Sequence, residues 1–428
     1  MPGRCIFCGV KTTPGNPCHS LLPRYAFPIA SSIPLACSGS FILASRPQSL
    51  DLIRRLIAFD TTSRNSNLEL IDFLRNYLGD HGIKSELIFD VTGKKANLYA
   101  TIGPDDRAGY ALSGHTDVVP IDGQDWSSDP WTVKEEGDRL YGRGTSDMKG
   151  FLGVVLNAVP ELSRRQLSTP VHLLFSYDEE VGCLGVRRAL EVIKDLPVKP
   201  KGCVIGEPTS MKVAIAHKGK TSLRCHVHGL ECHSSLAPKG VNAVEYAAEL
   251  ISYLKRMGRR FAAQGPFDQD YDVPHTTVHT GIVKGGTALN IVPKDCSFDF
   301  EFRYLPVQNP ADLVAEVKRF ADEELAKEMR AINGECGFSW QQISAFPGLD
   351  TAEDAEITVI AKALTQANDT IKIAFGTEGG LIQQIDIPTV ICGPGSIEQA
   401  HKPNEWVMLE QIAQCEAFLE RLTARVSS

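Results

Sequence analysis

Histidine and carboxylate side chains recur along this sequence where apolar stretches give way to loops. Five of them have the chemistry of ligands for a divalent metal ion: His115, Asp147, Glu180, Glu207 and His401. Two imidazoles and three carboxylates suit zinc or a similar ion. They are too many for one tetrahedral ion with an open position, but they fit two ions if one carboxylate bridges. A pair of ions about 3.5–4 Å apart can activate a water and polarise a carbonyl group.

Each of these residues, taken alone, is better explained as an ordinary loop acid or a hydrogen-bonded histidine. Their joint occurrence in five loops, among glycines, favours a metal site. The motifs that carry them are SGHTDVVP, GRGTSDMKG, YDEEVG, GEPTS and GSIEQAHKPNEW. Because sites in open α/β sheets form at the carboxyl ends of strands, we expect these loops to converge.

Three consecutive acids, Asp178, Glu179 and Glu180, follow the apolar stretch VHLLFSY. Like charges repel, and a carboxylate beside apolar residues loses hydration. One glutamate facing a cation would be neutralised, and its neighbour would stay free to move a proton from water to a leaving amine. Asp178 receives no role. Gly182 and Gly185 predict a tight turn into the next helix.

The composition is that of an ordinary globular protein. The 428 residues suffice for two or three domains, with 43% hydrophobic and 22% charged residues. A formal net charge of -8 argues against a nucleic-acid partner, and no uncharged apolar run reaches the roughly 18 residues of a membrane helix. The sequence has 12 cysteines, but a chain of this length needs no disulfide framework, so we predict a reducing compartment and a cytoplasmic location.

The first 46 residues differ from the rest, because they are rich in Pro, Ser and Gly and no acid precedes Asp51. They are typical of a leader, a disordered extension or an upstream start. Cys5 and Cys8 could begin a zinc knuckle, but the spacing lacks a convincing second half.

The elements that would hold the metal ligands follow a strand–helix rhythm. Residues 48–82 predict two amphipathic helices around a turn, and short apolar strands then alternate with helices up to 210. After 210 the order becomes β-β-α-β-β-α, which fits a small antiparallel sheet with two helices on one face. The first rhythm returns near 348. We predict an α/β catalytic domain in two parts, 47–212 and 339–428, interrupted by an α+β domain at 213–338.

The five motifs, in this order, resemble those of the M20 metallopeptidase and deacylase family over about residues 48–425. GTEGGLIQ (376–383) and ICGPGSIEQAHKPNEW look most like the branch that deacetylates acetylornithine. The resemblance implies a zinc-peptidase-like catalytic domain with an inserted, ferredoxin-like lid and dimerisation domain. Where two other branches usually have Asp, this chain has Glu378.

The resemblance also implies roles for the metal ligands. Asp147 would bridge two zinc ions, with cobalt as an alternative metal. His115 and Glu207 would hold one ion, and Glu180 and His401 the other. A cis peptide would follow Asp147.

The resemblance also implies catalytic or positioning roles for three further residues. Glu179 would be the general base, and Asp117 would accept from the far nitrogen of His115 and fix its tautomer. His233 would reach across a homodimer to stabilise the oxyanion, although alone it could be a helix-capping or surface histidine.

Substrate-binding residues are also implied. Asn290 and Arg303 would bind the substrate's α-carboxylate, for which a guanidinium is suited, though Arg303 could simply face solvent. Glu378 would meet the ornithine ammonium or cap its loop.

The predicted reaction is hydrolysis of N-acetyl-L-ornithine to L-ornithine and acetate, in arginine biosynthesis. The alternatives are another M20 hydrolase, namely an N-acyl-amino-acid deacylase, a succinyl-diaminopimelate desuccinylase or a dipeptidase, and an inactive metal-bound binding module. The presence of a base together with all five ligands argues against the last.

Overall fold

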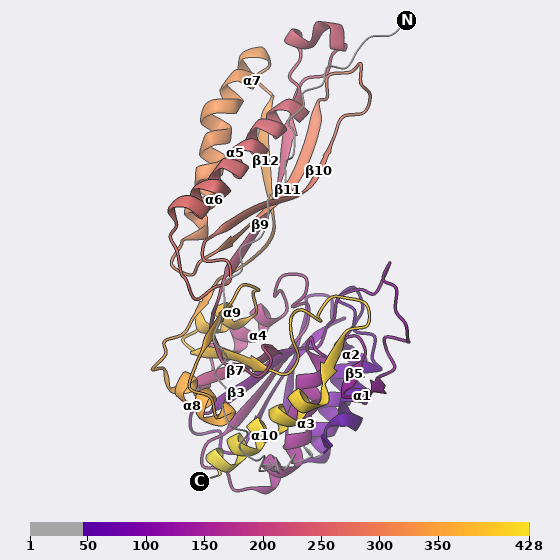
Figure 1. Cartoon of the computed structure of the whole chain (residues 1–428), viewed down its shortest axis with the longest axis vertical. Coiled ribbons are helices and arrows are strands. Elements are labelled where there is room, and N and C mark those ends of the chain that lie inside the picture. Colours follow the sequence, from indigo (N-terminus) through magenta and orange to yellow (C-terminus); the bar gives the residue numbers. More distant parts are fainter. Residues whose placement is uncertain (1–45, 428) are drawn as a thin grey trace, which may run out of the picture. The chain divides into compact units, whose positions relative to one another are not determined.

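A mixed β-sheet forms the centre of the α/β part of the computed structural model, which describes residues 46–427 (Figure 1). The predictions for the leader and for Cys5 and Cys8 lie outside these residues. Within them, the sheet has nine strands in the order β1-β2-β6-β3-β7-β15-β8-β13, with β14 beside β8. The strands are β1 (Ser85–Phe89), β2 (Ala96–Ile102), β3 (Tyr110–His115), β6 (Val171–Ser176), β7 (Gly202–Pro208), β8 (Ala214–His217), β13 (Leu349–Asp350), β14 (Ile371–Ile373) and β15 (Thr389–Gly393).

The central strands are parallel and buried. β3 pairs in parallel with β6 and β7, and β7 pairs in parallel with β15. Every residue of β3, β6 and β7 is buried, which explains their near-continuous apolar sequences. Their carboxyl ends therefore meet at one edge of the sheet.

Helices cover this sheet. α3 packs against β3 and β7, and α1 and α10 pack against α3 (Figure 1). The helices of this part are α1 (Leu50–Ile57), α2 (Leu68–Asp80), α3 (Lys149–Arg164), α4 (Val186–Ile193), α8 (Glu356–Thr365), α9 (Gly379–Gln383) and α10 (Leu409–Val426). No helix in the described part of the chain is long and apolar enough to cross a membrane.

A small second sheet joins distant parts of the chain. It consists of β4 (Lys134–Glu136), β5 (Arg139–Tyr141) and β16 (Trp406–Met408). Trp406 pairs with Tyr141, and α10 begins only at Leu409.

The inserted α+β part is a four-stranded antiparallel sheet with helices on one face (Figure 1). Its strand order is β10-β11-β9-β12. The elements are β9 (Gly219–His228), the 3₁₀ helix η1 (Ser234–Lys239), α5 (Ala243–Gln264), β10 (Thr277–Gly285), β11 (Asp295–Tyr304), α6 (Pro310–Phe320), the π-helix η2 (Ala321–Leu325), α7 (Ala326–Ile332) and β12 (Gly337–Phe346). Alternate residues of β11 are buried, with its phenylalanines facing α5 and the core. The α/β class with an inserted α+β domain is confirmed.

Two details differ from the prediction. The predicted inserted domain, 213–338, includes both β8 and β9, but β8 belongs to the large sheet and β9 to the inserted one. β12 was not predicted, since its exposed glutamines, Gln341 and Gln342, interrupt the apolar alternation. Because β12 pairs with β9 as far as Phe346, we propose that the inserted domain ends there rather than at 338.

Candidate metal centre and active site

The predicted metal ligands meet at the carboxyl edge of the large sheet. His115 is the last residue of β3, and Glu207 lies near the end of β7. Glu180 follows β6, and Asp147 lies just before α3. His401 comes from the segment between β15 and β16, where its φ of 63° turns the chain. The parallel pairing of β3, β6 and β7 thus brings together residues that are far apart in the sequence.

Asp147 lies between the two histidines. Its Oδ1 is 2.9 Å from His115 Nε2, and its Oδ2 is 3.1 Å from His401 Nε2. His115 Nε2 is also 3.5 Å from Glu207 Oε1, and His401 Nε2 is 3.0 Å from Glu180 Oε2. The two oxygens of one carboxylate thus face two separate groups of ligand atoms, as a bridging ligand requires.

In the described part of the chain, two groups of three residues have one ligand atom per residue, with these atoms within 4.8 Å of one another. The first contains His115, Asp147 and Glu180, and the second contains His115, Glu179 and Glu207. Both glutamates of the acidic triplet therefore lie beside the cluster. The Asp147–Met148 peptide bond is cis, as the resemblance implied.

The raised pKa values of the acids in this cluster indicate a site for a cation. Burial raises the pKa of Glu180 to about 7, and it raises the pKa values of Glu179 and Glu207 well above their usual range. Neighbouring carboxylates add to each shift. Glu180 Oε1 is buried and has no hydrogen-bond partner among the described residues. These buried carboxylates, together with the unpaired oxygen of Glu180, suit divalent metal ions. The positive charge of such ions would favour the ionised form of the carboxylates.

The histidines of the cluster respond to the same acids. Hydrogen bonds to Asp147 and Glu180 raise the pKa of His401 to about 11. Burial alone would lower the pKa of His115, but Asp147 and Glu207 outweigh it and raise that pKa. These imidazoles must lose a proton before they can bind a metal ion.

Asp117 contacts His115 through its main chain. Nδ1 of His115 donates to the main-chain carbonyl of Asp117 at 2.9 Å, whereas the Asp117 carboxylate is 3.7 Å away. The carboxylate accepts instead from the main-chain N–H groups of Glu179 (3.1 Å) and Glu180 (3.3 Å) and from the hydroxyl of Ser63 (2.7 Å). Asp117 therefore holds His115 through its backbone and the two glutamates through its side chain.

Asp178, which had no predicted role, anchors the acidic turn. Its Oδ1 lies 2.5 Å from Lys95 Nζ, and its φ is 54°. Lys95 also donates to the main-chain carbonyl of Ser63. The first acid of the triplet is thus paired with a lysine and separated in function from the other two.

A cavity of about 310 Å³ opens over the cluster. Its wall combines the clustered acids and His401 with apolar and cationic side chains. The residues are Asp147, Glu179, Glu180, Gly182, Glu207, Lys220, Arg303, Phe346, Phe375, Gly376, Ile397 and His401. Arg303 Nε lies 3.0 Å from Glu301 Oε1, and Lys220 Nζ lies 3.5 Å from Glu301 Oε2.

Only some of the predicted substrate-binding residues line this cavity. Arg303 lines the cavity, and so does Lys220, which sequence reasoning missed. The only signal for Lys220 was its position in register with Arg303 on the neighbouring strand. Glu378 is only 1% exposed and does not line the cavity, so its position does not fit direct contact with a substrate ammonium.

His233 and Asn290 lie together, away from the cavity of their own chain. His233 precedes η1, and its Nδ1 accepts from the N–H of Ser235. The carbonyl of Asn290 accepts from the N–H of Ser234 at 3.0 Å. Neither residue lines the cavity.

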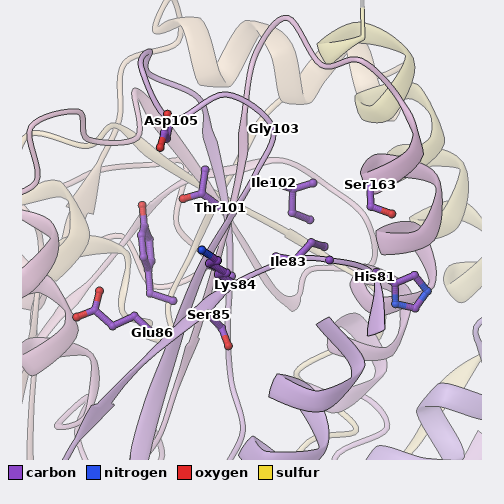
Figure 2. Close-up of a pocket in the computed structure, with 13 residues that line it drawn as sticks. His81, Ile83, Lys84, Ser85, Glu86, Thr101, Ile102, Gly103, Asp105 and Ser163 are labelled. Carbon is purple, nitrogen blue, oxygen red and sulfur yellow. The ribbon is translucent and has the colours of Figure 1, made fainter. Parts of the chain in front are cut away.

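A second cavity, of about 600 Å³, lies beside β1 and β2 (Figure 2). Its polar groups are spread along the wall, with Glu86 and Asp105 apart from His81 and Ser163 (Figure 2). None of the candidate metal groups in the described chain lies there, and none of the predicted site residues lines it. Size alone therefore does not make it the active site.

Comparison with known proteins gives the family of this site. Residues 111–425 match the model of peptidase family M20/M25/M40. The chain belongs to this family. As a member it is a metal-dependent hydrolase of amide bonds.

Curated relatives of this M20 protein include two acetylornithine deacetylases. The one from Pasteurella multocida is 35% identical over 88% of this chain and 97% of its own. The one from Myxococcus xanthus is 32% identical over 87% of this chain and 96% of its own.

Solved structures share the fold. An aminopeptidase from Bacillus cereus matches with a TM-score of 0.65 at 22% identity, over 89% of this chain and 97% of its own. A dinuclear metal-binding M20 peptidase from Bacillus subtilis matches with a TM-score of 0.61 at 16% identity, over 88% and 97%.

Proposed function

We propose that this M20 enzyme hydrolyses N-acetyl-L-ornithine to L-ornithine and acetate with two divalent ions, zinc being the best match to the ligands. The observation that carries the chemistry is the placement of Asp147 between His115 and His401 within a ring of buried acids. The identity to acetylornithine deacetylases over most of the chain supports the substrate. The reaction would belong to arginine biosynthesis.

In this proposal Asp147 would bridge the ions, His115 and Glu207 would hold one, and Glu180 and His401 would hold the other. When bound, such ions lower the pKa of water and polarise an amide carbonyl. The protein sets the positions of the carboxylate oxygens and imidazole nitrogens that would bind the ions. Asp117 contributes by holding His115 and the N–H groups of both glutamates.

Glu179 is the proposed general base. It lines the cavity, and the hydrogen bond from its N–H to Asp117 holds its backbone in place. Its carboxylate would take a proton from the attacking water and deliver it to the leaving amine. Burial and the neighbouring acids favour its protonated form, which is the form needed in the second half of the reaction.

Arg303 and Lys220 are proposed to bind the substrate's α-carboxylate. Glu301 lies between their cationic groups and holds both at the cavity wall. Two cations with one carboxylate between them leave a net positive charge, which favours an anion. A guanidinium also matches the planar geometry of a carboxylate.

A homodimer through the inserted domain is proposed to complete the site. His233 and Asn290 lie outside the cavity of their own chain, so a second copy would have to supply them. The edge strand β10 is largely exposed, and the apolar side chains of Ile282, Val283, Leu289 and Ile291 nearby are exposed as well. Unpaired strand edges and exposed apolar groups favour association with another chain.

The proposed compartment is the cytoplasm. Each cysteine in the described part of the chain is unpaired, and most are buried. Unpaired thiols are typical of reducing compartments.

One observation favours a second candidate, a broader N-acyl-amino-acid deacylase. Among the described residues, the carboxylates that line the cavity all belong to the metal cluster. With Glu378 buried, the cavity wall has no separate acid for the ornithine ammonium. The side chain of the substrate would then be selected by shape, against Phe346, Phe375 and Ile397.

The test is a panel of kcat/KM values for the zinc-loaded enzyme. It should contain N-acetyl-ornithine, its α-carboxamide, N-acetyl-methionine, N-succinyl-diaminopimelate and a dipeptide. We expect N-acetyl-ornithine to be the best substrate and the α-carboxamide to have a raised KM. Removal of the metal by a chelator should abolish turnover, and Glu179→Gln should lower kcat by about 10²–10⁴-fold.

Preference for N-acetyl-methionine would favour the second candidate, and preference for the dipeptide would contradict both. A zinc-loaded enzyme that is inactive on the whole panel would revive the binding-module alternative. Unchanged turnover of Glu179→Gln would contradict the role of the base.

A further inference from the structure

The carboxylate of Glu405 is enclosed by the loop that carries Asp147. Its Oε1 accepts from the main-chain N–H groups of Ser146 (2.8 Å) and Asp147 (3.0 Å). Its Oε2 accepts from the N–H of Gly144 (3.0 Å) and from Arg143 Nη1 (2.7 Å). The side chains of Glu405 and Arg143 are each 1% exposed. One buried carboxylate thus organises four donors, three of them in the backbone of this loop.

The same hydrogen bonds continue to His401. Arg143 Nη2 donates to Gln124 Oε1 at 2.5 Å, and Gln124 Nε2 donates to the main-chain carbonyl of His401 at 2.9 Å. His401 Nε2 in turn lies 3.1 Å from Asp147 Oδ2. The contacts close a ring from Asp147 through Glu405, Arg143 and Gln124 to His401 and back.

We propose that Glu405 is a positioning residue that sets the distance between two proposed metal ligands, Asp147 and His401. It binds the N–H of Asp147 directly, and it holds His401 through Arg143 and Gln124. It also lies only four residues after His401 on the same segment. A bridging carboxylate must face two ions at once, so a small shift of its loop misplaces both of its oxygens. This inference rests on the proposed metal centre but not on the proposed substrate.

The substitution Glu405→Gln tests this role with little change in volume. A glutamine has one oxygen, so its NH₂ group must face two of the four donors, and the loop must move to separate them. Partners of metal ligands typically contribute about 10–100-fold to metal affinity. We therefore expect metal-free Glu405→Gln to bind zinc about 10–100-fold more weakly in calorimetric titrations. Activity should recover as zinc is raised.

The substitution Gln124→Ala breaks the link from Arg143 to His401 and so tests it separately from the contact of Glu405 with Asp147. It releases the carbonyl of His401 but leaves the hydrogen bonds of Glu405 to Asp147 in place. We expect it to weaken one zinc ion only, so that dialysed protein retains fewer zinc ions per chain than the wild type. The matched control is Glu416→Gln, because Glu416 Oε1 also accepts a backbone N–H, from Ser49 at 2.7 Å, away from the cluster. It should leave zinc binding unchanged.

Circular dichroism and the unfolding midpoint of each metal-free variant show whether it folds. A folded Glu405→Gln variant that binds zinc with wild-type affinity and stoichiometry overturns the proposal. If that variant does not fold, Gln124→Ala decides, and wild-type zinc binding by it overturns the proposal instead. Because zinc binding is measured without substrate, the result stands even if N-acetyl-ornithine is not the substrate.

Discussion

At the scale of single residues, His172 is a buried imidazole outside the active site. It lies on β6, where its Nδ1 is 2.9 Å from the hydroxyl of Tyr99 and 3.0 Å from that of Thr101. Its Nε2 has no hydrogen-bond partner within residues 46–427. Burial lowers the pKa of His172 to about 4, so the folded protein holds this imidazole in its neutral form near pH 7.

This gives a pH dependence with a definite sign. The unfolded chain has an ordinary histidine pKa of about 6.5, so acid protonates the unfolded chain first and favours it. The contribution of neutral His172 to the free energy of unfolding is fully present above about pH 6.5 and is lost as the pH falls toward 4. At pH 5 the loss should be about 2 kcal/mol in the free energy of unfolding.

Urea unfolding of the wild type and of His172→Gln, at pH 7.5 and 5.0, checks this expectation. Glutamine keeps an acceptor for the two hydroxyls but does not titrate, so the variant should lose about 2 kcal/mol less than the wild type on acidification. The exposed His279 supplies the control, His279→Gln, which should behave as the wild type does. Equal losses in His172→Gln and in the wild type would contradict the argument.

Sequence reasoning named residues that meet in space, but not their surroundings. His115, Asp147, Glu180, Glu207 and His401 could be selected because their residue types suit a metal and because they occur together in five loops among glycines. The burial of Glu378 could not be predicted, since a glycine-flanked acid has the same local sequence whether it faces a cavity or the core. Lys220 was missed because its approach to Arg303 depends on the register of β9 and β11.

At the scale of elements, the contact between β7 and α3 places Glu207. Gly206 precedes Glu207 in β7, and a Cβ added there would lie 1.9 Å from Cγ of Phe151. Phe151 belongs to α3 and is 1% exposed. Cγ is the ring atom bonded to Cβ of Phe151, so a change in the Phe151 rotamer alone cannot relieve the clash. The missing side chain of Gly206 thus allows α3 to lie close to the carboxyl end of β7.

The substitution Gly206→Ala should therefore separate β7 from α3. We expect a loss of about 1–3 kcal/mol in the free energy of unfolding, the usual cost of overpacking a core. Because Glu207 is the next residue, zinc affinity should fall as well. Urea unfolding and calorimetric zinc titration measure the two effects.

The same substitution at Gly79 is the control. Apart from its chain neighbours and the backbone of α2 itself, no described heavy atom lies within 4 Å of a Cβ added to this exposed glycine. There alanine should be neutral or stabilise the protein by up to about 1 kcal/mol, through its higher helix propensity. If Gly206→Ala behaved in the same way, the proposed close packing would be wrong.

The elements themselves were mostly predictable, for a physical reason. Strands buried on both faces have continuous apolar sequences, so β3, β6 and β7 stand out against the amphipathic helices between them. β12 and β16 lack this signal. β12 has polar residues on its exposed face, and the three residues of β16 are too few to show a period. Their pairing depends on partners far away in the sequence, which a local pattern does not contain.

At the scale of the whole molecule, the sequence indicates that one domain is inserted into another, but it does not indicate the oligomeric state. The change of rhythm after 210 and its return near 348 indicated one domain inserted into another. How many copies form an active enzyme depends on surfaces such as β10, whose sequence is that of any edge strand. The position of His233 outside its own cavity makes the proposed homodimer testable through activity.

Complementation between two inactive variants decides whether a partner chain supplies His233. Both His233→Ala and Glu179→Gln homodimers should be nearly inactive, because each site lacks one group. In a heterodimer, the site with an intact Glu179 would receive His233 from the Glu179→Gln chain, and the other site would lack both groups. Purified through two different tags, the heterodimer should therefore have about half the wild-type kcat per dimer, as one of two symmetric sites is complete. If His233 acted within its own chain, neither site would be complete and no activity would return, and a chain that is monomeric in light scattering would likewise contradict the proposal.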